Sequence, residues 1–489
     1  MTAGTPLATL ASVLRADDLL REIVGAEDAA VLGASQDSRS IRRGDVFLAW
    51  AGSATDAHDY VGAAAQAGAA AAVVERVVEG VDLPQLVVTD GRRAAALVAD
   101  AVEGFPSRAL RTVAVTGTNG KTTTALLTRH LLGATTRAAA LGTLGIVGPD
   151  GQLHDGAALT TPGPVELART LRELVDADVE WLVMEASSHA LDQHRLDALK
   201  LDAAVFTNLS LDHLDYHETF SAYRDAKLRL VELLGVDGRA VVNAAEAAWG
   251  RLDLTRIVRY AVQADADIVA DEVECRAGGS SFRVRAGEWR TRAELPLPGR
   301  FNIENALAAL ATALVAGVPF DAAVARLASA PQVPGRMEVL QREPFTVIID
   351  FAHTPDALEN LLTTVRSLTP GTLRVLFGAG GDRDRSKRAP MAATVARHAD
   401  RVWVTSDNPR TEDPESILDD LVAGLRNADH RREVDRVKAI HGVIEEAATG
   451  DVIVLAGKGH ETVQVVGTEK RPLDERVIVR DALRARGLA

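Results

Sequence analysis

Cysteine is nearly absent from this chain, because only Cys275 occurs among its 489 residues. A single cysteine excludes an internal disulfide and a metal cage built from cysteines, and this usage fits a reducing compartment. Positive charge is also scarce, with 54 Lys and Arg against 68 Asp and Glu and a net charge of −14. This balance argues against a general nucleic-acid or acidic-membrane surface. Any anionic ligand must therefore be held by a local cluster of basic residues.

Long apolar runs are lacking as well. The alanine-rich stretches, such as residues 62–74, are too short and too small-sided to span a bilayer. The first residues show no basic segment followed by an apolar one, so we expect no signal peptide and no membrane insertion. Aromatic residues make up only 4%, but 47% hydrophobic and 25% charged residues are usual for a globular protein. We expect a cytoplasmic, monomeric enzyme, whose length predicts two to four domains.

Residues 111–124, Arg-Thr-Val-Ala-Val-Thr-Gly-Thr-Asn-Gly-Lys-Thr-Thr-Thr, carry the clearest chemical signal. The β-branched run 113–116 predicts a buried strand, and the apolar stretch after the loop predicts a helix. The backbone N–H groups of such a glycine-rich loop can hold a phosphate, with Lys121 on the outer phosphates and the Thr122 hydroxyl on Mg²⁺. Val115 replaces the first glycine of the standard phosphate-loop motif. The strand–loop–helix setting still predicts an ATP site.

Short apolar strands alternate with helical stretches along the whole chain, which predicts an α/β fold with mostly parallel sheets. We divide it into three domains, 1–108, 109–336 and 337–489, with a plausible linker near residue 104. In the third region, four polar motifs directly follow strands: Asp350-Phe-Ala-His-Thr-Pro, Gly380-Gly-Asp-Arg-Asp-Arg, Ser406-Asp-Asn-Pro-Arg and Gly457-Lys-Gly-His-Glu. Because ligands gather at the carboxyl ends of parallel strands, these motifs predict an active-site rim. The segment from Gly378 is not a dinucleotide fingerprint, since Arg383 stands where the third glycine belongs.

These motifs, taken with others along the chain, resemble the Mur ligases, and among them the members that add the third residue of the peptidoglycan stem peptide. The further matching segments are Asp37-Ser-Arg, Gly44-Asp-Val-Phe, Thr160-Thr-Pro, Glu185-Ala-Ser-Ser-His, Asp212-His-Leu-Asp-Tyr-His, Asn302-Ile-Glu-Asn and Pro334-Gly-Arg-Met-Glu. The resemblance implies a UDP-substrate domain, a central ATPase domain and a C-terminal Rossmann-like domain that brings the amino acid. It implies a ligase that uses ATP and Mg²⁺ to join meso-diaminopimelate to UDP-N-acetylmuramoyl-L-alanyl-D-glutamate through an acyl phosphate.

The same resemblance assigns the catalytic groups. Lys121 serves the phosphates, while Thr122 and Glu185 hold one Mg²⁺ and His213 helps to hold a second. Lys227 stands where Mur ligases carry a carbamylated lysine (N6-carboxylysine), whose negative charge orients metal. From its sequence context alone, Lys227 is an ordinary solvated helical lysine. The remaining ATP residues implied by the family are Gly117, Thr118, Asn119, Gly120, Thr123, Asn302, Asn305, Arg336 and Asp350.

The family resemblance also implies binding residues for the two other substrates. Those for the UDP-muramyl dipeptide are Ser38, Ser53, Thr160, Thr161, Ser187, Gln193 and Arg195. Those for diaminopimelate are Arg383, Asp407, Asn408, Pro409, Arg410, Gly457 and Glu461. In this family the Asp-Asn-Pro-Arg form accompanies diaminopimelate, whose second carboxylate a guanidinium can grip with two parallel hydrogen bonds. Two departures from the family pattern are Phe351 for a usual tyrosine and Leu159 for an asparagine.

Three alternatives remain open at this point. The chain could be a lysine-adding member of the family, a folylpolyglutamate-type ligase of the same superfamily, or a non-catalytic nucleotide-binding regulator. Arg410 and the N-terminal Asp37-Ser-Arg segment argue against the two ligases. The joint presence of Lys121, Glu185, His213 and Lys227 argues against the regulator.

Overall fold

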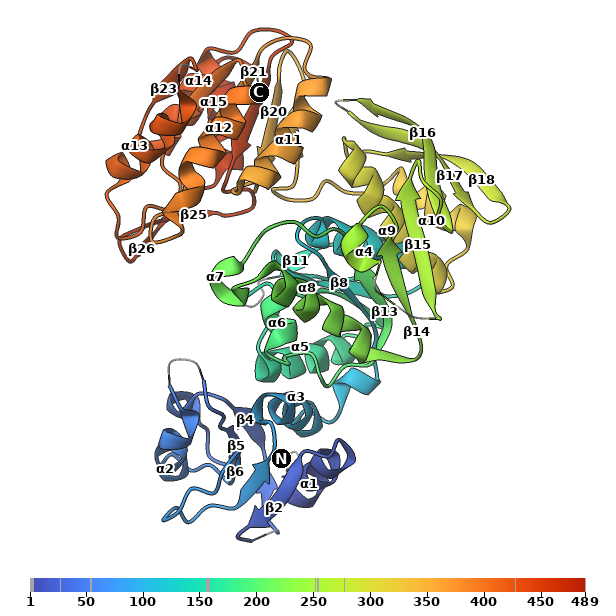
Figure 1. Ribbon diagram of the computed structural model, residues 1–489, viewed down its shortest axis with the longest axis vertical. Coiled ribbons are helices and arrows are strands. Elements are labelled where there is room, and N and C mark those ends of the chain that lie inside the picture. Colours follow the sequence, from blue (N-terminus) through green and yellow to red (C-terminus); the bar gives the residue numbers. More distant parts are fainter. Residues whose placement is uncertain are drawn as a thin grey trace. The chain divides into compact units, whose positions relative to one another are not determined.

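The computed structural model describes residues 4–26, 28–52, 55–154, 159–250, 252, 255–276, 278–426 and 428–488. The chain forms two compact units, Met1–Tyr260 with Ala308–Ala323, and Ala261–Leu307 with Val324–Ala489. Helices alternate with mostly parallel strands in both units (Figure 1), which confirms the α/β class. The predicted division of the chain into three domains, with boundaries at residues 108 and 336, stays a prediction. Among the described residues, no helix has the length and apolar character needed to cross a membrane.

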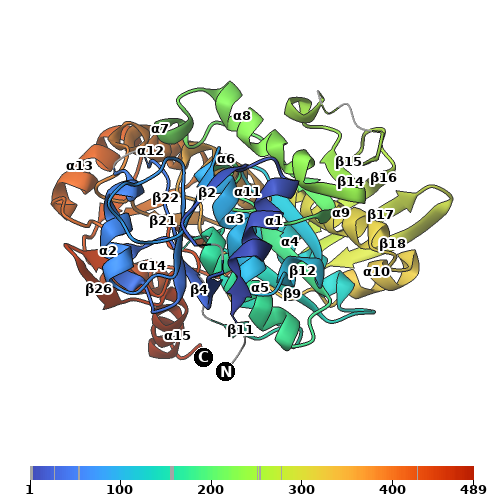
Figure 2. The ribbon, with the colours of Figure 1, turned by 90° about the horizontal axis from the view of Figure 1, so that it is seen from below.

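The N-terminal part of the first unit is a five-stranded sheet. Its order is β2 (Leu20–Val24), β7 (Gln85–Val88), β6 (Ala71–Val74), β5 (Asp45–Leu48) and β4 (Gly33–Ser35), parallel except for β2. Helices α1 (Leu7–Ala16) and α3 (Gly91–Val102) pack side by side (Figure 1 and Figure 2), and α2 (Val61–Gln66) follows β5. Asp90 caps α3 by accepting hydrogen bonds from the backbone N–H groups of Arg92 and Arg93. The short strands β1 (Thr5–Pro6) and β3 (Ala30–Val31) pair with each other.

The rest of the first unit is built on a larger sheet. Its order is β11 (Leu153–His154), β10 (Gly145–Val147), β9 (Ala138–Gly142), β12 (Trp181–Glu185), β8 (Arg111–Thr116), β13 (Leu201–Phe206), β14 (Leu234–Asn243) and β15 (Ile257–Val262). All strands from β9 to β15 in this order are parallel. The associated helices are α4 (Lys121–Leu132), α5 (Pro164–Asp176), α6 (Ser188–Asp192), α7 (Leu214–His217) and α8 (Phe220–Leu228). The central strands are buried, which explains their almost continuous apolar sequences.

The C-terminal part of the second unit is a doubly covered sheet. Its order is β19 (Glu338–Gln341), β20 (Thr346–Asp350), β24 (Val452–Ala456), β21 (Leu373–Phe377), β22 (Arg401–Val404) and β23 (His430–Arg432), parallel except for β19. One apolar core joins it to α11 (Pro355–Leu368), α12 (Arg388–His398) and α13 (Pro414–Leu425). A second core joins it to α14 (Arg436–Glu445) and α15 (Glu475–Ala485). The loops after β20, β21, β22 and β24 therefore leave the same edge.

The second unit also contains antiparallel elements. Strands β16 (Ile268–Arg276), β17 (Gly279–Ala286) and β18 (Trp289–Leu295) form a meander, and β25 (Val463–Val466) pairs with β26 (Glu469–Pro472) in a hairpin. Helices α9 (Arg300–Val315) and α10 (Phe320–Leu327) follow the meander.

Candidate functional site

The phosphate loop connects β8 to α4, as its sequence indicates. A Cβ atom on Gly117, whose φ is +145°, would lie 1.9 Å from the Thr207 hydroxyl, so only glycine fits there. The loop is tied to the chain after β13, because Thr118 N donates to Asn208 O (2.8 Å) and Asn119 N donates to Asn208 Oδ1 (2.9 Å). These bonds hold the loop in a single shape at the N-terminus of α4, where an anion is favoured.

Two lysine side chains meet at this loop. Lys121 Nζ donates to Gly117 O (3.0 Å) and Thr118 O (2.8 Å), and Lys227 Nζ donates to Gly117 O (2.9 Å). Lys227 is only 1% exposed, and its Nζ lies 4.5 Å from the centre of the Tyr223 ring. Burial, together with the charge of Lys121, lowers the pKa of Lys227 well below its ordinary value. Lys227 is therefore not the solvated lysine that its sequence context alone indicates.

Glu185 is the last residue of β12, the strand beside β8. In this parallel pair of strands it lies opposite Val115. The side chain is 2% exposed and accepts hydrogen bonds from Thr143 N (2.8 Å) and Thr143 Oγ1 (3.1 Å). Thr143 Oγ1 also shares a hydrogen bond with Thr160 Oγ1 (3.1 Å). Sequence reasoning missed Thr143, although it follows the small-residue strand β9 in the way that the other motifs follow their strands.

His213 lies in a cluster of rings close to the loop. Its ring centre is 4.9 Å from that of His189 and 6.1 Å from that of Tyr223. Tyr223 OH in turn shares a hydrogen bond with Thr118 Oγ1 (3.1 Å). Burial lowers the pKa of His213 and of His189, which favours the neutral imidazole over the charged form in both.

The predicted Mg²⁺ ligands fit the ion only in part. The Thr122 hydroxyl and the Glu185 carboxylate are the hard oxygen donors that Mg²⁺ prefers. The amine of Lys227 is not such a donor, whereas a carbamate on the same nitrogen would supply two oxygens. Among the residues that the structure describes, no three His, Cys, Asp or Glu side chains cluster closely enough to hold a metal ion by themselves. The donor set therefore fits Mg²⁺ with the modified lysine and ATP oxygens included.

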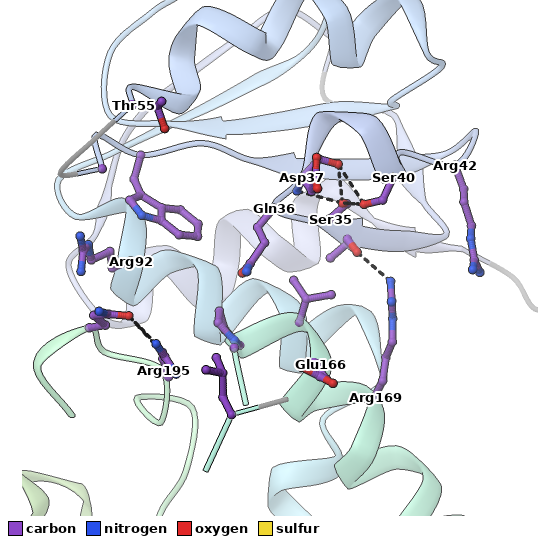
Figure 3. Close-up of a pocket in the computed structure, with 18 residues that line it drawn as sticks. Ser35, Gln36, Asp37, Ser40, Arg42, Thr55, Arg92, Glu166, Arg169 and Arg195 are labelled. Carbon is purple, nitrogen blue, oxygen red and sulfur yellow. Dashed lines mark hydrogen bonds between the residues drawn. The ribbon is translucent and has the colours of Figure 1, made fainter. Parts of the chain in front are cut away.

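A separate cavity of about 550 Å³ lies in the first unit, between the loops of the N-terminal sheet and α5. Figure 3 shows Ser35, Asp37 and Ser40 gathered on one wall, with Arg92 and Arg195 on another. Trp50 adds an aromatic surface, and the cations that line the cavity are Arg42, Arg92, Arg169 and Arg195. An aromatic ring beside several guanidinium groups suits a ligand that joins a base to phosphates.

The residues predicted for the UDP-muramyl dipeptide fall partly in this cavity. Gln193, Arg195 and the departure Leu159 line it, and Ser38 adjoins its lining residues Asp37 and Ser40 without being one of them. Ser53 lies outside the described residues. Sequence reasoning missed the other three arginines of the lining, Arg42, Arg92 and Arg169, because none of them belongs to a recognisable motif.

Thr160, Thr161 and Ser187 instead lie between the cavity-lining Arg195 and Glu185. Arg195 donates to Thr161 O (2.7 Å), and the Thr161 hydroxyl donates to Glu185 O (2.8 Å). Ser187 N donates to Thr161 Oγ1 (3.0 Å). This chain of contacts connects the wall of the cavity with the backbone carbonyl of Glu185.

In the second unit the four polar motifs lie together at the carboxyl edge of the sheet, as the strand–loop pattern predicts. Arg410 Nη1 donates to Gly381 O (2.7 Å), and its backbone has the left-handed φ of +51°. A Cβ atom built on Gly380 would have Arg410 Nη1 at 3.1 Å and Arg383 Cγ at 3.6 Å. The Arg410 guanidinium and the aliphatic stem of Arg383 therefore both lie against the backbone at Gly380.

A buried polar network lies beside these arginines. Lys458 is fully buried and donates to Asn408 Oδ1 (3.1 Å) and to Glu461 Oε2 (2.8 Å), while Asn408 Nδ2 donates to the same carboxylate oxygen (2.9 Å). Asp407 adjoins Gly457, where a Cβ atom would lie 2.8 Å from Asp407 Oδ2. Lys458 was missed as a site residue, although it stands inside the Gly-Lys-Gly-His-Glu motif.

The other ATP residues of the second unit make mainly local contacts. Asp350 accepts hydrogen bonds from Met337 N and Ala352 N, each at 2.7 Å, so it holds the backbone after Arg336. The Arg336 guanidinium lies 4.7 Å from the centre of the Phe351 ring, so the phenylalanine keeps an aromatic face at this position without a hydroxyl. Asn305 Nδ2 donates to Asn302 Oδ1 (3.2 Å) on α9.

Comparison with known proteins extends along nearly the whole chain. Residues 115–313 match the Mur ligase middle domain, and residues 335–459 match the Mur ligase, glutamate ligase domain. A UDP-N-acetylmuramoyl-L-alanyl-D-glutamate--2,6-diaminopimelate ligase of Geobacillus kaustophilus is 42% identical to this chain. The aligned part covers 94% of this chain and 96% of that ligase. The ligase of that name from Thermosynechococcus vestitus is 43% identical over 91% of each chain. A solved structure of a ligase of that name is 32% identical, with a TM-score of 0.71 over 99% of both chains.

Proposed function

We infer the reaction from the family, since this chain belongs to the Mur ligases. It joins meso-diaminopimelate to UDP-N-acetylmuramoyl-L-alanyl-D-glutamate and hydrolyses ATP to do so. The product is a UDP-muramyl tripeptide used in peptidoglycan synthesis. The similarity to diaminopimelate ligases along nearly the whole chain supports this assignment. We place the enzyme in the cytoplasm as a monomer that uses Mg²⁺.

The first step transfers the γ-phosphoryl group of ATP to the D-glutamate carboxylate. The loop from Gly117 to Gly120 surrounds the phosphates with backbone N–H groups, and Lys121 exchanges its two carbonyl partners for phosphate oxygens. Mg²⁺ bound by Thr122, Glu185 and His213 would neutralise phosphate charge. Phosphoryl transfer depends on positioning and on charge neutralisation, and these groups contribute to both.

Lys227 is suited to carbamylation, in which a neutral amine adds to CO₂ and releases a proton. The lowered pKa of Lys227 favours the neutral amine that this reaction needs, because burial disfavours the ammonium form. The product places a carboxylate beside Lys121, whose positive charge then stabilises it. Carbamylation puts a negative charge at this buried position, which favours a cation in the site.

The second step is attack by the amine of the incoming amino acid on the acyl phosphate. A tetrahedral intermediate forms, the bond from carbon to phosphate oxygen breaks, and phosphate leaves. We assign Arg383 and Arg410 to the distal carboxylate of diaminopimelate and Glu461 to its ammonium group. Lys458 and Asn408 both donate to Glu461 Oε2, so they fix the orientation of that carboxylate. We assign its other oxygen, Oε1, to an ammonium group of the substrate. The observation that carries this substrate assignment is that the Arg410 guanidinium and the Arg383 stem both lie against the backbone at Gly380.

An amino-acid panel tests the proposal. With ATP and the UDP-muramyl dipeptide, phosphate release should be rapid with meso-diaminopimelate and very slow with L-lysine or glutamate. A bidentate contact between arginine and carboxylate contributes about 1.5–3 kcal/mol, or roughly ten- to a hundredfold in discrimination. Arg410→Ala should raise the KM for diaminopimelate while the KM for ATP stays unchanged. Equal kcat/KM for lysine and diaminopimelate in the wild type would refute the substrate assignment.

A further inference from the structure

An arginine and a glutamate form a completely buried ion pair in the second unit. Arg436 is the first residue of α14 and Glu475 is the first residue of α15. Arg436 Nε donates to Glu475 Oε1 at 2.7 Å, and both side chains are 0% exposed. Neither residue belongs to the phosphate loop or to the four motifs at the sheet edge.

The remaining nitrogens of Arg436 reach the backbone directly before two of those motifs. Nη1 donates to Ser406 O (3.2 Å) and Nη2 donates to Ala456 O (3.0 Å). Ser406 precedes Asp407, and Ala456 precedes Gly457. The guanidinium therefore links the carboxyl ends of β22 and β24, which are not neighbours in the sheet because β21 lies between them.

Stability of the fold does not account for this arrangement. The helix dipoles do not decide the matter, because the N-terminus of α14 disfavours the cation of Arg436 while that of α15 favours the anion of Glu475. A buried ion pair is on average no more stabilising than apolar side chains of similar size. The pair is also incompletely satisfied, since Glu475 Oε2 has no hydrogen-bond partner among the described residues. What Arg436 does provide is a rigid planar fork, which fixes the distance between two carbonyl groups.

We propose that Arg436, held by Glu475, is a positioning residue for the incoming amino acid. It fixes the spacing between the motif from Asp407 to Arg410 and the motif from Gly457 to Glu461. This inference rests on the proposed function, in which one motif holds the distal carboxylate and the other holds the ammonium group. Arg436 touches no substrate and acts through the two loops.

The test replaces the whole pair. In Arg436→Met/Glu475→Met both charges are removed together, so no unpaired charge is left in the core. The KM for diaminopimelate should rise about tenfold or more, since a misplacement of about 1 Å in a binding site can cost that much. The KM values for ATP and for the UDP-muramyl dipeptide should stay unchanged, and the preference for diaminopimelate over lysine should fall. In Arg436→Lys the charge is kept and the fork is lost, so this variant should fold normally and show an intermediate KM.

Arg374→Met/Asp451→Asn is the matched control, because it also removes both charges of an ion pair in the same unit. Arg374 (11% exposed) pairs with the buried carboxylate of Asp451 (2.9 Å), but it lies near the amino end of β21. This variant should keep the wild-type KM for diaminopimelate. Equal changes in all three KM values, a wild-type KM in Arg436→Met/Glu475→Met, or the same KM shift in Arg374→Met/Asp451→Asn would each overturn the positioning role. If the wild type accepted another amino acid instead, the substrate assignment would be wrong, and the same comparison with that amino acid would still test Arg436.

Discussion

A single methyl group at position 381 should separate the two loops that we assign to the distal carboxylate. Gly381 has an ordinary backbone conformation, so Gly381→Ala is a purely steric change. Its Cβ would lie 1.9 Å from Pro409 O, and real Cβ contacts stay beyond 3.0 Å, so the loops must separate by at least 1.1 Å. The methyl group thus pushes the segment that contains Arg383 away from the segment that contains Arg410.

The free-energy cost of separating the loops can be estimated from the hydrogen bonds that Gly381 makes. Gly381 N donates to Asn408 O (2.9 Å), and Arg410 Nη1 donates to Gly381 O (2.7 Å). Losing the neutral bond costs about 0.5–1.5 kcal/mol and losing the charged one about 1.5–3 kcal/mol. The strain is local, and overpacking of this kind typically costs about 1–3 kcal/mol, so the protein should still fold. A shift of about 1 Å in a positioning group lowers kcat/KM by up to about a hundredfold.

The assay is the initial rate of phosphate release with diaminopimelate varied and the other two substrates saturating. The expected result is a large rise in the KM for diaminopimelate with an unchanged KM for ATP. The control is Gly278→Ala in the same unit, where the nearest atom to the new Cβ, Arg342 Nη1, lies at 3.6 Å, an ordinary contact. Wild-type kcat/KM for diaminopimelate in a folded Gly381→Ala protein would refute the assignment of these two loops.

Three further predictions concern charge. Lys121→Ala should abolish ligation with a normal circular dichroism spectrum, because this side chain bonds to loop carbonyls outside the apolar core; near-normal turnover would contradict the ATP site. Lys227→Ala should be nearly inactive and partly rescued by an added short carboxylate, whereas full wild-type activity in CO₂-depleted buffer would argue against the carbamate. Burial lowers the pKa of His460 from 6.5 to about 4, so the unfolded chain binds the proton more tightly and stability is lost as the pH falls from 6.5 toward 4. Between pH 7 and pH 5 urea unfolding should show a loss of about 2 kcal/mol from this group, which His460→Gln should lack; equal losses in both proteins would refute it.

The local sequence was sufficient for the secondary structure that carries the site. The strand expected at 113–116 is β8 (Arg111–Thr116), and the helix expected after the phosphate loop is α4 (Lys121–Leu132). β-Branched runs followed by glycine and polar residues predict a buried strand and a loop from neighbouring residues alone. For the same reason the four motifs of the second unit were predicted at strand ends, and they lie there.

The partners of the charged side chains were decided only by tertiary structure. Lys227 is far along the chain from Gly117, and nothing in its helix indicates that folding buries its amine against that loop. Arg436 follows no recognisable motif, yet it bonds to backbone before two of them. The order of the strands was also decided only by tertiary structure, because β24, which comes late in the chain, lies between β20 and β21. Secondary structure follows from local backbone and side-chain preferences, whereas the burial of a charge depends on which distant strands pack together. The sequence by itself therefore determined the phosphate loop and the edge at which the motifs lie, and the tertiary structure decided which charges are buried and paired there.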